Sequence, residues 1–169
     1  RITRDGAIPA SNPFQGAGTA RCNSAGRSAP GTICQETFAW GLRNPFRFAF
    51  RPGTSQFYIN DVGQNAWEEI DLGQAGADYG WNCREGTHPN STSGKCNPTP
   101  PNLVAPIYDY DHSSCGSITG GAFVPDGVWP ADYTGTYLFA DYVCGKIFVL
   151  KNQSGSFSAT SFATNMGVN

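Results

Sequence analysis

The sequence has few charged residues, and they are not gathered into runs of one sign. Lys, Arg, Asp and Glu together make up 14% of the 169 residues, and the formal net charge is −2. No basic stretch offers the positive surface that a nucleic acid or an anionic membrane would require, so neither is expected as a partner. No apolar run approaches the ~20 residues of a membrane-spanning helix, so no membrane span is expected.

Sustained helical patterns are also missing, whereas turn residues are abundant. The chain contains 21 Gly and 12 Pro, and 13% of its residues are aromatic. Gly and Pro mark turns and interrupt helices, and aromatic side chains suit the faces of β-sheets. The composition therefore predicts an all-β protein, with one domain over residues 1–169 that is long enough to bury a hydrophobic core.

The strongest strand signal lies in the first half of the chain. Residues 46–51 alternate at the strand period, so their three Phe should share one face. Residues 52–54 (Pro-Gly-Thr) provide a turn, and residues 57–62 resume extended structure before Gly63 interrupts it. This pattern predicts an antiparallel hairpin followed by a third short strand. Further strand candidates are residues 107–112, 117–124, 136–142, 146–151 and 157–162.

An internal echo indicates a repeated unit. Residues 57–62 (Phe-Tyr-Ile-Asn-Asp-Val) correspond to residues 137–142 (Tyr-Leu-Phe-Ala-Asp-Tyr), and a Gly-containing break follows each. The offset of 80 residues exceeds the roughly 40–50 of a propeller blade, and the Pro- and Ser-rich excursion at residues 82–106 would account for the excess. Repeated antiparallel meanders favour a β-propeller, and a β-sandwich is the alternative.

The six cysteines do not have the CxxC spacing of a zinc site, and their even number predicts disulfides. Sequential pairing closes the shortest loops, although six cysteines permit 15 connectivities. It would join Cys22 with Cys34, Cys83 with Cys96, and Cys115 with Cys144. Long disulfide-stapled loops imply an oxidising compartment, extracellular or periplasmic.

One short stretch, residues 41–45 (Gly-Leu-Arg-Asn-Pro), does not look like plain scaffold. Arg43 offers a fixed fork of donors suited to a carboxylate, and Asn44 offers a donor and an acceptor beside it. The alternative is that Arg43 braces a loop through backbone carbonyls and Asn44 caps a turn.

This stretch, residues 60–71 (NDVGQNAWEEID), the DYGW at residues 78–81 and the SITGG at residues 117–121 together resemble the soluble glucose and sorbosone dehydrogenase family. Hedgehog-interacting-protein-like proteins are among its members. The resemblance implies a six-bladed β-propeller that binds pyrroloquinoline quinone (PQQ) and Ca²⁺. At 169 residues the chain would hold about two to three blades, so a partial propeller is expected.

The same resemblance implies roles for individual residues. It implies that Arg43, Asn44 and, less directly, Lys146 contact PQQ, that the backbone carbonyls of Gly63 and Gln64 bind Ca²⁺, and that Tyr79, Trp81 and His112 line the sugar pocket. The simpler alternatives are core aromatics for Tyr79 and Trp81, a satisfied loop histidine for His112 and a solvated lysine for Lys146. Asp61 and Glu68 could orient the Gly63 corner, and a turn-capping Asp and a solvated Glu are the simpler interpretation.

The expected function is that of a PQQ-dependent aldose dehydrogenase, which oxidises the sugar C1 hydroxyl to a lactone. The family's general-base histidine would fall before Arg1, and neither His88 nor His112 matches it, so no catalytic residue is assigned and this chain alone should be inactive. Expected partners are a sugar or glycan, and either the remaining blades or a second copy. The alternatives are a non-catalytic secreted propeller that binds a glycan or protein, and a structural extracellular protein stiffened by disulfides.

Overall fold

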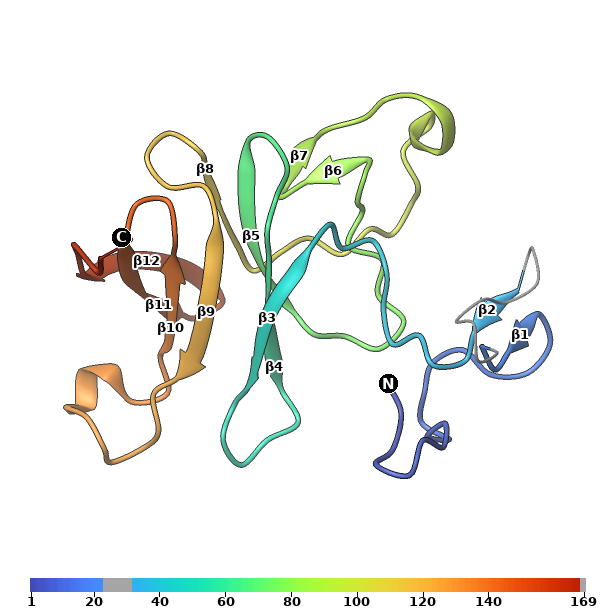
Figure 1. The fold of residues 1–169 in the computed structure, drawn as a ribbon, viewed down its shortest axis with the longest axis horizontal. Helices are drawn as coiled ribbons and strands as arrows, with labels where there is room; N and C mark the ends of the chain where they lie inside the picture. Colours follow the sequence, from blue (N-terminus) through green and yellow to red (C-terminus); the bar gives the residue numbers. More distant parts are fainter. Residues whose placement is uncertain (23–31, 168–169) are drawn as a thin grey trace.

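The computed structural model describes residues 1–22 and 32–167, and these contain no α-helix. Two four-stranded antiparallel sheets dominate the fold, and in both of them the strands follow one another in sequence order (Figure 1). The first sheet contains β3 (Pro45–Phe50), β4 (Phe57–Asp61), β5 (Trp67–Leu72) and β8 (Tyr108–Asp111). The second contains β9 (Ile118–Phe123), β10 (Tyr137–Asp141), β11 (Lys146–Gln153) and β12 (Ser156–Ala163).

Two such consecutive meanders are blades of a β-propeller, so the predicted all-β partial propeller is confirmed. The sequence echo has a structural meaning, because β4 and β10 are each the second strand of their sheet. The excursion between β5 and β8 carries the small ladder of β6 (Arg84–Glu85) and β7 (His88–Pro89) and the 3₁₀ turn η1 (Gly94–Cys96). Another 3₁₀ turn, η2 (Ala131–Tyr133), lies between β9 and β10.

The hydrophobic core lies between the two sheets. Strand alternation points every second side chain of β4 and β5 toward the second sheet, and these meet the inner faces of β9, β10 and β11. Each large apolar side chain buried in this way stabilises the fold by about 1.5–3 kcal/mol. The core residues are Tyr58, Ile70, Ile118, Phe123, Tyr137, Phe139 and Leu150.

A buried asparagine fastens the two sheets at this interface. Asn60 in β4 donates two hydrogen bonds from Nδ2, to the carbonyl oxygens of Thr119 (3.1 Å) and Gly120 (2.8 Å). The Tyr137 hydroxyl donates to Asn60 Oδ1 at 2.9 Å. Because every polar atom of this fully buried side chain is used, it sets the register between the sheets without an unsatisfied group.

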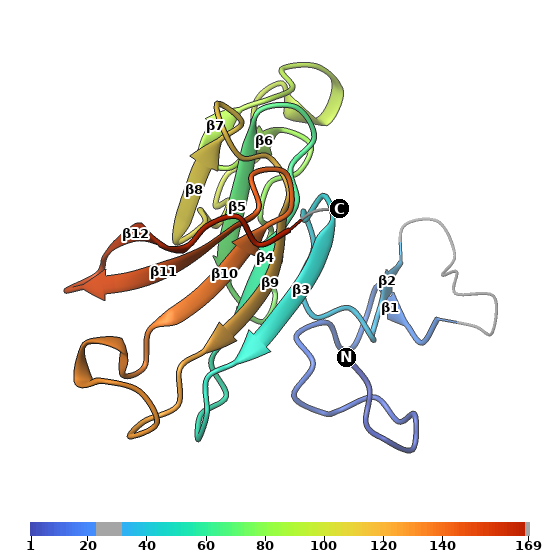
Figure 2. The same cartoon turned by 60° about the vertical axis from the view of Figure 1, so that its left-hand side comes forward.

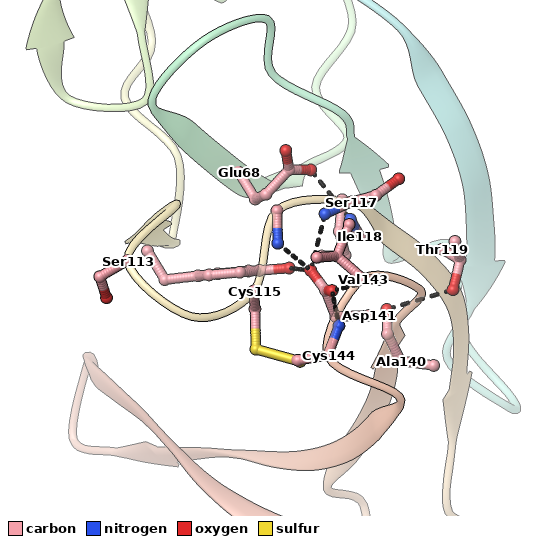
Figure 3. The surroundings of a disulfide bond; sticks show 12 residues. Glu68, Ser113, Cys115, Ser117, Ile118, Thr119, Ala140, Asp141, Val143 and Cys144 are labelled. Atoms are coloured by element: carbon pink, nitrogen blue, oxygen red, sulfur yellow. Dashed lines mark hydrogen bonds between the residues drawn. A yellow bond between two sulfur atoms is a disulfide. The ribbon is translucent and has the colours of Figure 1, made fainter. Parts of the chain in front are cut away.

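The disulfides join the cysteines in the predicted sequential order: Cys22 with Cys34, Cys83 with Cys96, and Cys115 with Cys144. The first fastens the segment of β1 (Thr19–Ala20) and β2 (Ile33–Cys34), and the second closes the excursion between β5 and β8. The third ties the β8–β9 loop to the β10–β11 turn, beside the buried carboxylate of Asp141 (Figure 3).

One end of the two sheets gathers the loops of interest. Strands β3 and β9 lie side by side and point the same way in both views, so their first residues are at the same end (Figures 1 and 2). The cross-strand pairs Pro45–Asp61 and Ile118–Asp141 place the β4–β5 and β10–β11 turns there as well. We call this the upper end, formed by residues 43–45, 62–66, 112–117 and 142–146. No helix of the described part is long and apolar enough to cross a membrane.

Candidate functional site

The Arg43–Asn44 corner is fixed through its backbone and open at its side chains. The backbone N–H groups of Arg43 and Asn44 donate to the two carboxylate oxygens of Asp61, at 2.8 and 2.6 Å. The Val62 N–H donates to the Asn44 carbonyl at 3.0 Å, and Arg43 Nη1 lies 3.4 Å from the Val62 carbonyl oxygen. Both side chains are exposed, so the guanidinium can receive an anionic group from solution.

Asp61 therefore orients this corner and does not cap its own turn. The bracing of a loop by Arg43, the alternative raised by the sequence, is limited to its long contact with Val62.

The β4–β5 turn holds a second fixed feature. The backbone N–H groups of Gln64, Asn65, Ala66 and Trp67 all donate to Oε1 of Glu85, at 2.6 to 3.3 Å. Burial raises the pKa of Glu85, but these four bonds outweigh it and hold the pKa below its ordinary value. The turn thus encloses the carboxylate of Glu85, and the role of the Gly63 and Gln64 carbonyls as Ca²⁺ ligands stays a prediction.

Three carboxyl groups meet on the face of the first sheet that looks away from the second. Strand alternation turns Glu69 and Asp71 of β5 to the same side, and Asp61 is the cross-strand partner of Glu69. Their nearest oxygens all lie within 4.8 Å of one another, and the residues are 1% (Asp61), 7% (Glu69) and 0% (Asp71) exposed. We call these three residues the acid cluster.

Three oxygen atoms of the acid cluster lack hydrogen-bond partners. Oε2 of Glu69 and both carboxylate oxygens of Asp71 are buried without a hydrogen-bond partner. The ion pairs found among the described residues do not include any member of the cluster. Oxygen atoms of this kind are the ligands that hard cations such as Ca²⁺ prefer, so the cluster fits a divalent cation.

The pKa values of the three carboxyl groups are all raised, which also indicates that the cluster lacks a compensating positive charge. Burial, reinforced by the negative charges of Asp71 and Asp61, raises the pKa of Glu69 to about 10. Burial also raises the pKa of Asp71 well above its ordinary value, with a further contribution from Asp61. Burial raises the pKa of Asp61 as well, against the hydrogen bonds from the Arg43 and Asn44 amides. Without a cation the three groups therefore share protons.

The two predicted sugar-pocket aromatics have different surroundings. Tyr79 is 1% exposed, its hydroxyl donates to the Leu72 carbonyl at 2.7 Å, and it packs with Ile59 and Ala77, which is the core alternative. Trp81 is half-buried, and its backbone N–H donates to the Gly41 carbonyl at 2.7 Å, beside the Arg43–Asn44 corner. Of the pair, only Trp81 has surface to offer a ligand.

Both histidines are engaged with carboxylates. His112 Nε2 lies 2.7 Å from Oε1 of Glu68, and Oε2 of Glu68 accepts the Ile118 N–H at 2.9 Å. Glu68 is fully buried, so the expectation of a solvated glutamate is wrong, because this carboxylate links β5 to the start of β9 (Figure 3). His88 stacks on Trp67 with ring centroids 3.5 Å apart and lies 3.6 Å from Asp109.

Lys146 begins β11 at the upper end and lines a cavity of about 340 Å³. Asp141, its cross-strand partner, accepts hydrogen bonds from the Tyr110 hydroxyl and from backbone N–H groups of both neighbouring loops (Figure 3).

Of the residues predicted to form the site, the structure places one group at the upper end: Arg43, Asn44, Gly63, Gln64, His112 and Lys146. It places Tyr79 in the core.

Sequence reasoning missed Glu69, Asp71 and Glu85. The signal for the first two was present in residues 67–72 (WEEIDL), where acids fall on both faces of a strand that the fold buries. Glu85 lies in a loop-rich stretch without periodicity, so no sequence pattern could have linked it to the turn at residues 64–67.

Two consecutive blades with a donor-rich end and a buried acid cluster define a β-propeller protein with a candidate cation and anion site. A sequence model of the family described as glucose / sorbosone dehydrogenase matches residues 1–167, so the chain belongs to this family.

Relatives with curated names include a plant and a bacterial protein. The chain is 33% identical over 164 residues to the HIPL2 protein of Arabidopsis thaliana, covering 89% of this chain and 22% of that protein. It is 32% identical over 81 residues to the aldose sugar dehydrogenase YliI of Escherichia coli K12, covering 48% of this chain and 18% of that protein. The chain thus spans about a fifth of the length of these relatives.

A solved structure agrees with the fold. The PQQ-bound aldose sugar dehydrogenase of Streptomyces coelicolor superposes with a TM-score of 0.66 at 17% identity, over 98% of this chain and 38% of that one. At this identity the likeness establishes the propeller fold alone.

Proposed function

We propose that this chain supplies part of the cofactor-binding end of a PQQ-dependent aldose dehydrogenase. The observation that carries the proposal is the Arg43–Asn44 corner, whose donor-bearing side chains are exposed on a backbone fixed by Asp61. PQQ, when bound, would supply the two-electron acceptor for an aldose: the C1 hydrogen would leave as hydride and the C1 hydroxyl proton would pass to a base, giving the lactone and the quinol.

Several side chains at the upper end could contact the cofactor and the sugar. The Arg43 guanidinium can pair with a carboxylate of the quinone through two parallel hydrogen bonds, and Asn44 beside it offers a donor and an acceptor. Lys146 adds one positive charge in the cavity at the start of β11. Trp81, beside the corner, offers a flat apolar surface for a sugar ring. The three disulfides support an extracellular or periplasmic location.

We place Ca²⁺ in the acid cluster. Its three carboxyls would supply only oxygen ligands, and a bound cation would satisfy the unpartnered oxygens of Glu69 and Asp71. The Gly63 and Gln64 carbonyls, in the β4–β5 turn that directly follows Asp61, are the alternative ligands.

The second candidate is a non-catalytic secreted propeller that binds a glycan or protein partner. One observation favours it: the plant HIPL2 protein aligns with more of this chain than the bacterial aldose dehydrogenase does.

Calorimetric titration of PQQ, in the presence of Ca²⁺, separates the two candidates when it is made with the protein at its full natural length. We expect saturable binding that Arg43→Ala weakens at least tenfold. Arg47→Ala is the matched control, because Arg47 is an exposed arginine in β3, four residues after Arg43, but lies over its neighbour Phe46. Absence of binding to the folded protein, or equal losses in both variants, would reject the quinone site and favour the recognition module.

A further inference from the structure

The carboxylate of Asp141 links two of the loops that form the upper end. Its Oδ2 accepts the Gly116 and Ser117 N–H groups of the β8–β9 loop, at 3.0 and 2.9 Å. Its Oδ1 accepts the Val143 and Cys144 N–H groups of the β10–β11 turn, at 2.9 and 3.2 Å. One side chain, 2% exposed, therefore joins the two loops, with one oxygen for each (Figure 3).

Asp61 has the same place in the first blade as Asp141 has in the second. Each aspartate ends the second strand of its sheet, and each is the cross-strand partner of the first residue of the first strand, Pro45 or Ile118. In both blades the two residues that precede this first strand donate their backbone N–H groups to the aspartate. The repeat indicates that Asp141 orders a ligand-binding part of the upper end, as Asp61 orders the Arg43–Asn44 corner.

Lys146 lies directly across the ladder from Asp141, but the two charges do not pair. Besides the four backbone N–H groups, the Tyr110 hydroxyl donates to Oδ2 of Asp141 at 2.6 Å. A carboxylate has about four acceptor sites, so these donors fill it and leave no place for an ammonium group. The ion pairs found in the described part of the chain do not include Lys146. Its charge is therefore available to a ligand in the cavity of about 340 Å³ that it lines.

We propose that Asp141 is a positioning residue, which fixes the β10–β11 turn against the β8–β9 loop so that Lys146 presents its charge to the quinone. This inference rests on the proposed function. Asp141 does not touch the quinone in this account, because its oxygens face the two loops and the Tyr110 hydroxyl. A turn that is already ordered leaves less ordering to be done when the ligand binds.

The charge of Asp141 and its positioning role predict opposite results for Asp141→Asn. If only the charge mattered, removing a negative group beside the site would strengthen the binding of an anionic ligand. If position matters, binding weakens, because the NH₂ group of asparagine would face backbone N–H donors and release one of the loops. The Cys115–Cys144 disulfide still joins the two loops, so the variant is expected to fold.

The experiment is a calorimetric titration of PQQ at full natural length, with Ca²⁺ present throughout, in the unaltered protein, in Asp141→Asn and in Tyr110→Phe. Tyr110→Phe is the matched control, because it removes one hydrogen bond to the same carboxylate but none of the four from the loops. We expect Asp141→Asn to weaken PQQ binding at least fivefold and Tyr110→Phe less than twofold. Both should lower the thermal unfolding midpoint, so lost stability alone would not separate their affinities.

A double variant tests whether Asp141 acts through Lys146. Lys146→Met alone should weaken PQQ binding by a factor similar to that of Asp141→Asn. Adding Asp141→Asn to Lys146→Met should change the affinity less than twofold, because the positioned group is already gone. Hydrogen exchange gives a readout without ligand: the Val143 and Cys144 amides should exchange at least tenfold faster in Asp141→Asn and at an unchanged rate in Tyr110→Phe.

Unchanged or tighter PQQ binding in folded Asp141→Asn would overturn the inference and leave the quinone site standing. Losses that add fully in the double variant would overturn it as well. Failure of PQQ to bind the folded, unaltered protein would instead refute the proposed function, and this inference with it.

Discussion

At the scale of single residues, the acid cluster is the feature that most needs an explanation. Asp71 has no exposed surface, and neither of its carboxylate oxygens has a hydrogen-bond partner. An ionised carboxylate in such a place costs several kcal/mol, so the group must either hold a proton or meet a cation. Glu69, two residues earlier on the same strand face, is also buried and has one carboxylate oxygen, Oε2, without a partner.

Calcium affinity is accordingly expected to rise with pH. Without a cation the pKa of Glu69 is raised from 4.5 to about 10, whereas Ca²⁺ binds the ionised form, so binding must release protons. The dissociation constant should fall by about tenfold per pH unit for each proton released between pH 6 and 8. Calorimetry at several pH values, in buffers of different ionisation enthalpy, counts the protons.

The same linkage has a consequence for stability. This carboxyl imposes no penalty on the cation-free protein below its ordinary pKa of 4.5, and the penalty grows as the pH rises toward 10. An affinity for Ca²⁺ that does not change with pH, or binding without proton release, would contradict the assignment of the cation to the cluster.

Sequence reasoning reached some of these residues and not others, for physical reasons. Arg43 and Asn44 could be picked out because the donors of a guanidinium beside a side-chain amide suit a ligand that bears carboxylates. The role of Glu68 was misjudged because adjacent acids look alike in a sequence, whereas the strand sends Glu68 to the inter-sheet face and Glu69 to the other. Only the packed fold distinguishes those two faces.

At the scale of elements, the β4–β5 turn is shaped around the carboxylate of Glu85. A methyl group on Gly63 would overlap the Trp67 carbonyl oxygen and would approach Oε1 of Glu85 to 2.7 Å. The close backbone approach, and not an unusual dihedral angle, is what requires glycine here.

Gly63→Ala is therefore expected to lower the free energy of unfolding by about 2–4 kcal/mol, because backbone must move or the Glu85 contacts must break. Gly120→Ala is the matched control: its added methyl would lie 4.0 Å from the Ala140 side chain and should change stability by less than about 1 kcal/mol. Urea unfolding curves measure both. Equal stability of the two variants would show that the Trp67 carbonyl and the Glu85 carboxylate can move aside at little cost, which would contradict the prediction.

The strands themselves were largely predictable. Residues 46–51 alternate at the strand period, and residues 57–62 and 136–142 are rich in aromatic and aliphatic side chains; β3, β4 and β10 begin and end within about one residue of these ranges. The loop contacts could not be predicted. The contact between Glu85 and the turn at residues 64–67 joins segments about 20 residues apart, and it depends on where the excursion between β5 and β8 folds back.

At the scale of the whole molecule, one outer face of the first sheet is apolar and exposed. Phe46, Phe48 and Phe50 are 44%, 62% and 56% exposed, and the rings of Phe48 and Phe50 pack on each other and on Phe57. Phe48 and Phe50 share a face, as the alternation predicted, and the described residues leave all three rings of β3 exposed. Such a surface favours association.

The 169-residue chain on its own is expected to self-associate through this face. Phe48→Ser should shift sedimentation equilibrium toward monomer, since it removes the most exposed ring of the three. Val128→Ser is the control, because Val128 is 67% exposed in the β9–β10 loop, away from this face. A monomer at all concentrations, or an equal shift in both variants, would contradict the expectation.

The most direct test of the account is an anaerobic single-turnover measurement on the protein at its full natural length, loaded with PQQ and Ca²⁺. An aldose is added and the absorbance of the quinone is followed. The account predicts sugar-dependent reduction of up to one quinone per chain, lost together with quinone binding in Arg43→Ala. An unchanged spectrum with PQQ demonstrably bound would contradict the dehydrogenase assignment and leave a propeller that binds without catalysis.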